Sequence, residues 1–200
     1  MKLYEELPCS IELDGKFYKF RASFRGILAC YDIMQDKDLE DIEKIMIIYE
    51  CLFTSWSRFK ARKKDIFFKC QMVVEVFDLL NDKKKKGKSQ KVVDFEQDSR
   101  YIYAGFYQCY GIDLFKVNLH WWQFLSLFNG LSNDTKIMQI IDIRQKPIPK
   151  PTKYNADERM RLMRLKAEYQ LEMSQEEREK QFADNLNGLF DALKGIAEKR

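Results

Sequence analysis

The spacing of apolar positions divides this chain into a short N-terminal segment with β-strand alternation and a long remainder with helical spacing. Apolar residues flank Asp14 and Gly15 on both sides in alternating runs: Ile11, Leu13, Phe17, Tyr18 and Phe20. An Asp-Gly pair between two such runs favours a type I′ turn, in which both central residues have positive φ. We therefore predict a β-hairpin within residues 1–24. A lone hairpin is marginally stable, so it must pack on helices, pair with another subunit or gain a third strand.

From residue 25 onward the apolar residues recur every three or four positions, which predicts amphipathic helices. A short helix has the stripe Phe24, Ile27, Leu28 and Tyr31. A second helix follows the loop at 36–38, with the stripe Leu39, Ile42, Ile45, Met46, Tyr49, Leu52 and Phe53. A third is expected between a cap at Asp65 and an end at Asn81, with the stripe Ile66, Cys70, Val73, Val74, Phe77 and Leu80.

Two basic segments separate these helices from their neighbours, and we expect both to be loops. Residues 54–64 combine Trp56 with five basic residues, Arg58, Lys60, Arg62, Lys63 and Lys64. Residues 81–91 contain six lysines and one aspartate, and they account for the net charge of +4. Aromatic and basic residues together can bind single-stranded nucleic acid. A charged loop exposed to solvent is the simpler interpretation of both segments.

Residues 94–144 are the richest in aromatic side chains and should form the centre of the core, because large apolar side chains contribute most burial free energy. We predict three helices here. The first begins after Asp94, is apolar on nearly every side and therefore buried, and ends at Gly111. The second follows His120 and carries Trp121 and Trp122, and Gly130 ends it. Ser132 or Asp134 caps the third, and the prolines at 147, 149 and 151 stop it.

The proline-rich stretch marks the expected domain boundary. The prediction is a mainly α protein with three parts: a domain over residues 1–146 (hairpin 1–24, helical core 25–146), a linker over 147–154 and a helical arm over 155–200. Asn155 with Glu158 suggests a capping box at the start of the arm. A heptad seam follows near the C-terminus, at Phe182, Leu186, Leu189, Leu193 and Ile196. The seam needs an apolar surface, supplied either by this chain's own core or by a partner.

Candidate chemistry is sparse. The hydrophobic fraction of 46% excludes a disordered protein, and no apolar run is long enough to span a bilayer or to serve as a signal peptide.

The five cysteines have neither zinc-site nor disulfide-framework spacing, so we expect buried free thiols. The single histidine, His120, is expected to be structural. Asp94, Glu96 and Asp98 are expected to cap a helix. The chain has no GxGxxG, GxxxxGK[ST], HExxH, GxSxG or CxxC motif. We expect no catalytic site, cofactor or metal.

Several blocks in the aromatic segment resemble one family. These are DFEQDxxYIYAGFYQxYGIDL, LHWWQF, GLSNDT and IIDIR, with a weaker likeness in YEELPCSIELDGKFYKFRASFRGIL. Over residues 4–144 the chain resembles the bacteriophage "gp-fifteen" family of small tail-module proteins, encoded just before the tape-measure protein in long-tailed phages. The resemblance implies a tail assembly chaperone that binds the tape-measure protein in the host cytoplasm and is absent from the mature virion. Two alternatives stay open: a structural tail component retained in the virion, and a nucleic-acid-binding module using the two basic segments.

The expected partner is a protein rather than a membrane or nucleic acid, and self-association into a homo-oligomer is open. Our first candidate for the contact surface is the heptad seam at Phe182, Leu186, Leu189, Leu193 and Ile196. The helix carrying Trp121 and Trp122 is the second.

Overall fold

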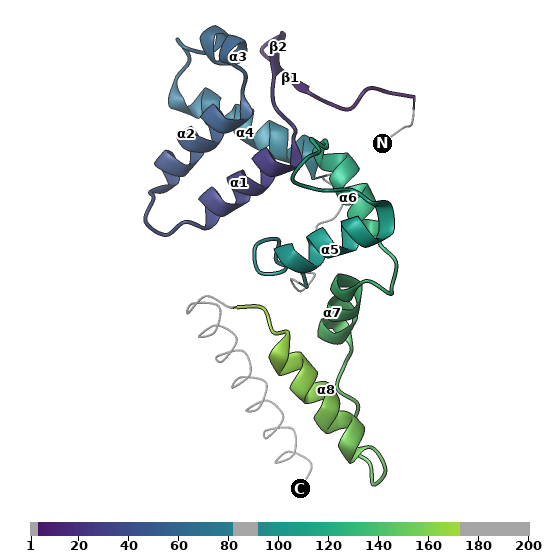
Figure 1. The fold of residues 1–200 in the computed structure, drawn as a ribbon. Helices are drawn as coiled ribbons and strands as arrows, with labels where there is room; N and C mark the ends of the chain where they lie inside the picture. Colours follow the sequence, from purple (N-terminus) through teal and green to yellow (C-terminus); the bar gives the residue numbers. More distant parts are fainter. Residues whose placement is uncertain (1–3, 82–91, 173–200) are drawn as a thin grey trace, which may run out of the picture. The chain divides into compact units, whose positions relative to one another are not determined.

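A computed structural model of the chain describes residues 4–81 and 92–172. It confirms a mainly helical fold with a small N-terminal hairpin (Figure 1). The strands are β1 (Ser10–Leu13) and β2 (Lys16–Lys19). The helices are α1 (Phe24–Gln35), α2 (Asp41–Leu52), α3 (Ser55–Lys60), α4 (Ile66–Leu80), α5 (Ser99–Tyr110), α6 (Trp121–Asn129), α7 (Lys136–Gln145) and α8 (Ala156–Glu168).

The described residues form two compact units. The first comprises residues 4–81 and 98–139, and the second comprises 92–97 and 140–172. The division falls inside α7, after Gln139. The proline-rich stretch therefore lies within the second unit.

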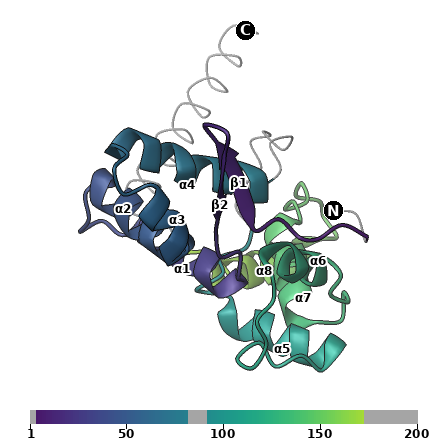
Figure 2. The ribbon, with the colours of Figure 1, turned by 90° about the horizontal axis from the view of Figure 1, so that it is seen from above.

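The hairpin has the predicted type I′ turn. Asp14 and Gly15 adopt φ values of 51° and 67°, and Ile11 pairs with Tyr18 across the two antiparallel strands. Of the three ways to stabilise the hairpin, the structure uses packing on helices: β1 contacts α4 and β2 contacts α3 (Figure 2). Phe20, just beyond β2, also pairs with Phe53 at the end of α2. This places the ring of Tyr18 in the core, edge-on against Phe68 of α4.

A second backbone pairing joins residues far apart in the sequence. The Phe24 N–H donates to the Leu119 carbonyl at 3.0 Å, and the Trp121 N–H donates to the Ala22 carbonyl at 2.7 Å. A guanidinium nitrogen of Arg25 donates to the Leu114 carbonyl at 2.6 Å. The start of α1 is thus fixed to the segment that leads into α6.

The centre of the first unit is a stack of three phenylalanine rings. Phe124 of α6 lies nearly parallel to Phe24 of α1, with ring centroids 4.9 Å apart, and nearly parallel to Phe106 of α5, with centroids 5.3 Å apart. All three side chains are buried. Aromatic pairs add about 0.5–1.5 kcal/mol each beyond the burial of their area. Trp121 and Phe128 extend this stack along α6.

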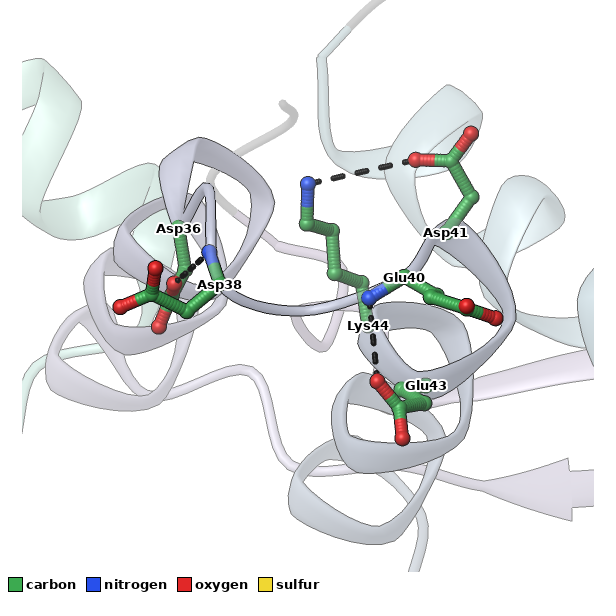
Figure 3. Close-up of polar contacts among 6 residues, drawn as sticks. All are labelled: Asp36, Asp38, Glu40, Asp41, Glu43 and Lys44. Carbon is green, nitrogen blue, oxygen red and sulfur yellow. Dashed lines mark hydrogen bonds and ion pairs between the residues drawn. The ribbon is translucent and has the colours of Figure 1, made fainter.

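The polar residues before α2 and α4 act as helix caps. The Phe68 N–H donates to Asp65 Oδ1 at 2.9 Å, which confirms the predicted start of α4. Figure 3 shows the start of α2: the Glu40 N–H donates to Glu43 Oε2 at 3.0 Å, and Asp36 accepts from the Asp38 N–H in the preceding turn.

The predicted stripe on α2 was partly wrong, because Ile42 is exposed whereas Ile48 is buried.

Residues 54–64 are not the predicted loop. Thr54 caps the short helix α3 by accepting from the Ser57 N–H, and the Ser57 hydroxyl donates to the Lys19 carbonyl at 2.8 Å. This buried hydroxyl fixes the helix to β2 by a polar contact rather than an apolar one. Apolar spacing therefore could not reveal α3.

Helix α5 begins later than predicted and is not buried all round. Asp94 Oδ1 accepts from the Glu96 and Gln97 N–H groups at 2.9 Å, which makes a turn instead of a helix cap. The helix starts only at Ser99. Its inner side is buried, but Tyr107 on the other side is exposed. The predicted C-terminal glycine is confirmed, since Gly111 has φ of 64°.

The second unit is held together around Arg144. Its guanidinium donates to the carbonyls of Tyr169 at 2.7 Å and Val92 at 2.9 Å, and its own carbonyl accepts from Lys166 Nζ at 2.7 Å. The Gln97 side chain donates to the Gln170 carbonyl and accepts from the Glu172 N–H. The first arm helix, α8, therefore packs within its own unit.

The capping box predicted at the start of the arm is not formed. Asn155 instead turns its side chain back to the proline-rich stretch, accepting from the Thr152 N–H at 2.8 Å and donating to the Lys150 carbonyl at 3.0 Å. Helix α8 ends at Glu168.

Two buried tyrosines offer a test of the first unit's packing. The hydroxyls of Tyr18 and Tyr49 have no hydrogen-bond partner among the described residues, whereas the Tyr110 hydroxyl donates to the Leu127 carbonyl at 2.9 Å. Because an unsatisfied buried hydroxyl is destabilising, Tyr18→Phe and Tyr49→Phe should each raise the free energy of unfolding by about 1 kcal/mol. Tyr110→Phe should lower it by a similar amount. Urea unfolding measures the free energy of unfolding of all three variants. A decrease in all three contradicts the unsatisfied hydroxyls of Tyr18 and Tyr49.

Candidate interaction surfaces

Helix α6 contributes to the core more than to the surface. Trp121, one of the predicted contact residues, is only 2% exposed. Trp122 is partly buried, and its indole N–H donates to the Leu80 carbonyl at 2.8 Å, which attaches α6 to the end of α4. Both tryptophans thus serve the packing of this chain. The heptad seam from Phe182 to Ile196 lies outside the described residues.

His120 caps α6 and connects it to the N-terminal segment. Its Nδ1 accepts from the Trp122 N–H at 3.1 Å, so the ring hydrogen is on Nε2, which lies 3.0 Å from the Pro8 carbonyl and donates to it. The His120 N–H in turn donates to Gln123 Oε1 at 2.9 Å. The prediction of a structural histidine is confirmed, and both ring nitrogens are in use.

The first exposed aromatic surface is the Tyr103 face, formed by Tyr103 and Tyr107 of α5 with Phe115 from the following loop. Phe115 is 80% exposed, and its ring centroid lies 5.3 Å from that of Tyr103. Asp113 shapes the loop by accepting from the Phe115 N–H at 3.0 Å and pairing with Lys116. These contacts, the backbone hydrogen bond first, hold the pKa of Asp113 below its usual value. Burial, followed by the nearby carboxylate of Asp113, raises the pKa of Tyr103.

The second exposed surface is the α3 face, formed by Phe17, Trp56, Phe59, Lys60 and Arg62. Trp56 and Phe59 are 63% and 55% exposed and lie nearly parallel, with centroids 5.8 Å apart. Lys60 Nζ lies 5.7 Å from the centre of the Trp56 ring, and the Arg62 guanidinium lies 3.9 Å from that of Phe59. Lys60 Nζ also donates to the Phe17 carbonyl at 3.4 Å. Apart from Phe17, the residues of this surface lie in the segment 54–64, which the sequence suggested for nucleic-acid binding.

The described residues show no arrangement typical of a metal centre or a membrane span. They contain no group of three or more His, Cys, Asp or Glu side chains placed to hold a metal ion. Each helix in residues 4–81 and 92–172 is too short or too polar to cross a bilayer. The acidic side chain of Asp94 is used in the turn before α5.

The cysteines are all free thiols, but they are not all buried as predicted. Cys30 is buried, whereas Cys9 and Cys51 are exposed. Burial, and to a smaller extent Cys51 and Asp32, raises the pKa of the Cys30 thiol to about 12. Nothing in this arrangement activates Cys30 as a nucleophile.

The fold is that of a small helical protein with a hairpin at its N-terminus and exposed aromatic side chains on two surfaces. A family model described as "Bacteriophage Gp15 protein" matches residues 3–171. The chain belongs to this bacteriophage family. No curated protein and no solved structure matches it.

The double role of His120 predicts unequal effects of two substitutions. His120→Ala removes the cap of α6 and the contact to Pro8, and should lower the free energy of unfolding by about 1–2 kcal/mol. His120→Asn keeps a capping oxygen but is too short to replace the contact to Pro8, so its loss should be about half as large. Urea unfolding of both variants checks this order, and equal losses contradict a capping role.

The thiols predict a reactivity order in the native protein. Because the thiolate is the reacting species, a pKa of about 12 leaves roughly one in ten thousand Cys30 side chains reactive at pH 8. A thiol-specific disulfide reagent should therefore modify Cys9 and Cys51 quickly and Cys30 only after unfolding. Peptide mass spectrometry identifies the labelled sites, with Cys30→Ala as the control. Rapid labelling of Cys30 in folded protein contradicts the buried placement.

Proposed function

We propose that this protein is a tail assembly chaperone-like factor that binds the tape-measure protein during tail morphogenesis. It acts in the host cytoplasm, does not catalyse a reaction and needs no cofactor. Membership of the bacteriophage family supports the setting. The gene position that the resemblance implies, just before the tape-measure gene, supports the choice of client.

The observation that carries the proposal is the Tyr103 face. It belongs to the segment with the strongest resemblance to the family, and it leaves Tyr107 and Phe115 exposed. Large exposed apolar side chains that lie together mark interaction sites. Each one removed from water on binding contributes about 1.5–3 kcal/mol.

The mechanism follows from the chemistry of the client. A very long amphipathic helix exposes apolar stripes that aggregate when left uncovered. Several copies of a small protein can cover these stripes by placing apolar side chains against them, as in helix-in-groove recognition. Tube subunits must later displace the copies, so each contact is weak and the total affinity comes from multivalency.

Two surfaces of the chain are assigned to the client. The first is the heptad seam with Leu186 and Leu193, whose spacing suits a helical partner. The second is the Tyr103 face. Trp121 is not assigned, because it is buried in the core. Trp122 is set aside as well, since its indole N–H is already bonded to Leu80.

Co-expression with the tape-measure protein of the same phage tests the proposal. Affinity-tagged full-length chain should retain the tape-measure protein. Leu186→Asp combined with Leu193→Asp should reduce the retained amount by about tenfold or more, because two apolar contacts of about 1.5–3 kcal/mol each are lost. Tyr107→Ala combined with Phe115→Ala should reduce it as well. Tyr154→Asp, at a residue that is 92% exposed and belongs to neither surface, is the matched control.

Two results contradict the proposal. One is a full-length chain that never retains the tape-measure protein. The other is abundant protein in purified mature virions, measured by mass spectrometry, which identifies a structural tail component instead. A shortened chain that ends at residue 172 lacks the seam. It keeps α8 and the hydrogen bonds of Arg144 and Gln97 to the residues directly after α8, so it tests the seam alone.

A further inference from the structure

The α3 face is an unusual surface because the helix contacts its neighbours through polar groups and points its aromatic rings outward. The buried side of α3 is the Ser57 hydroxyl, bonded to the Lys19 carbonyl at 2.8 Å. Phe17 of β2, Trp56 and Phe59 all remain exposed. In both ribbon views α3 lies beside β2 (Figures 1 and 2), and Lys60 Nζ of α3 donates to the Phe17 carbonyl at 3.4 Å. Exposed aromatic side chains in a common patch indicate an interaction site.

The charge that α3 and the turn after it contribute is positive, although the exposed Glu12 lies opposite Phe17 across the hairpin. Residues 54–64 contain five basic residues and no acidic one. Among these, Lys64 is paired with Asp14 at 2.7 Å. Within the described part of the chain, Lys60 and Arg62 form no ion pair with a carboxylate, and their charged ends lie over aromatic rings instead. A partner that supplies carboxylates therefore matches the surface.

The ring geometry favours a protein partner over single-stranded nucleic acid. Nucleobases bind by stacking on bare aromatic faces. Here the Arg62 guanidinium covers one face of Phe59 at 3.9 Å, and Lys60 lies over Trp56. A stacked base would have to displace a cation that its own phosphates require, whereas the carboxylates of a protein partner can pair with these cations where they lie. Tryptophan and arginine are the side chains that most often dominate the free energy of protein interfaces.

We propose that the α3 face is a docking surface for an acidic amphipathic helix of a protein partner. The apolar side of that helix covers Phe17, Trp56 and Phe59, and its carboxylates pair with Lys60 and Arg62. The α3 face shares no residue with the Tyr103 face or the heptad seam, so this second binding activity does not depend on the tape-measure proposal.

The test measures binding of the full-length chain to three probes by isothermal titration calorimetry. The first is a synthetic helical peptide of about 20 residues, long enough to form a helix, with Leu and Phe on one side and Glu on the other. The second has Lys in place of every Glu. The third is an oligothymidine strand of about 20 nucleotides. The acidic peptide should bind, with an affinity that falls as salt is added, and the basic peptide should not.

Two double variants locate the contact. Trp56→Ala combined with Phe59→Ala should weaken binding of the acidic peptide about tenfold or more, the loss typical of anchor residues. Lys60→Glu combined with Arg62→Glu should abolish it and create binding of the basic peptide. The matched controls are Tyr154→Ala for the aromatic pair and Lys150→Glu combined with Lys153→Glu for the charges. These controls lie at exposed sites elsewhere and should leave binding unchanged. Circular dichroism confirms that each variant is folded.

Three outcomes overturn the proposal. The first is an acidic peptide that does not bind, and the second is a loss of binding that is larger in Tyr154→Ala than in the α3 variants. The third outcome is oligothymidine that binds more tightly than the acidic peptide and is released by the Lys60 and Arg62 reversals. That result identifies a nucleic-acid surface.

Discussion

The stack of Phe24, Phe124 and Phe106 is the interaction on which the first unit depends. These rings belong to α1, α6 and α5, so a single buried side chain, Phe124, contacts both the N-terminal part of the chain and the aromatic segment. The backbone pairing between Ala22 and Trp121 reinforces the same junction. Truncating a buried phenylalanine costs about 3–5 kcal/mol, which is a large part of the total stability of a domain.

The large aromatic side chains of the first unit are divided between its core and its surface. Trp121 and Phe128 extend the stack, while Phe115 and Trp56 remain exposed on separate surfaces. A single exposed ring such as Tyr154 is common on folded proteins, whereas rings that lie together, as Trp56 and Phe59 do, indicate an interaction site. The two exposed surfaces differ in chemistry: the Tyr103 face is mainly aromatic, and the α3 face adds Lys60 and Arg62, which pair with no carboxylate among the described residues.

The second unit is organised by a different principle. Arg144 bonds to the carbonyls of Val92 and Tyr169, and Gln97 exchanges two hydrogen bonds with the backbone near residue 171. Hydrogen bonds to a charged group contribute about 1.5–3 kcal/mol each. This polar network fixes α8 although the helix buries little apolar surface, with Leu162 as its buried residue. The motif IIDIR thus contains a structural arginine that no hydrophobic pattern could identify.

Local sequence alone determined the hairpin turn at Asp14 and Gly15, the cap of α4 at Asp65 and the end of α5 at Gly111. Each depends on one residue's own conformational preference or on a hydrogen bond within one turn. The tertiary structure decided the existence of α3, the burial of Trp121 and the exposure of Trp56. These features depend on which distant backbone groups and rings come together. Spacing along the chain does not encode that information, because a helix has the same period whichever side its partners cover.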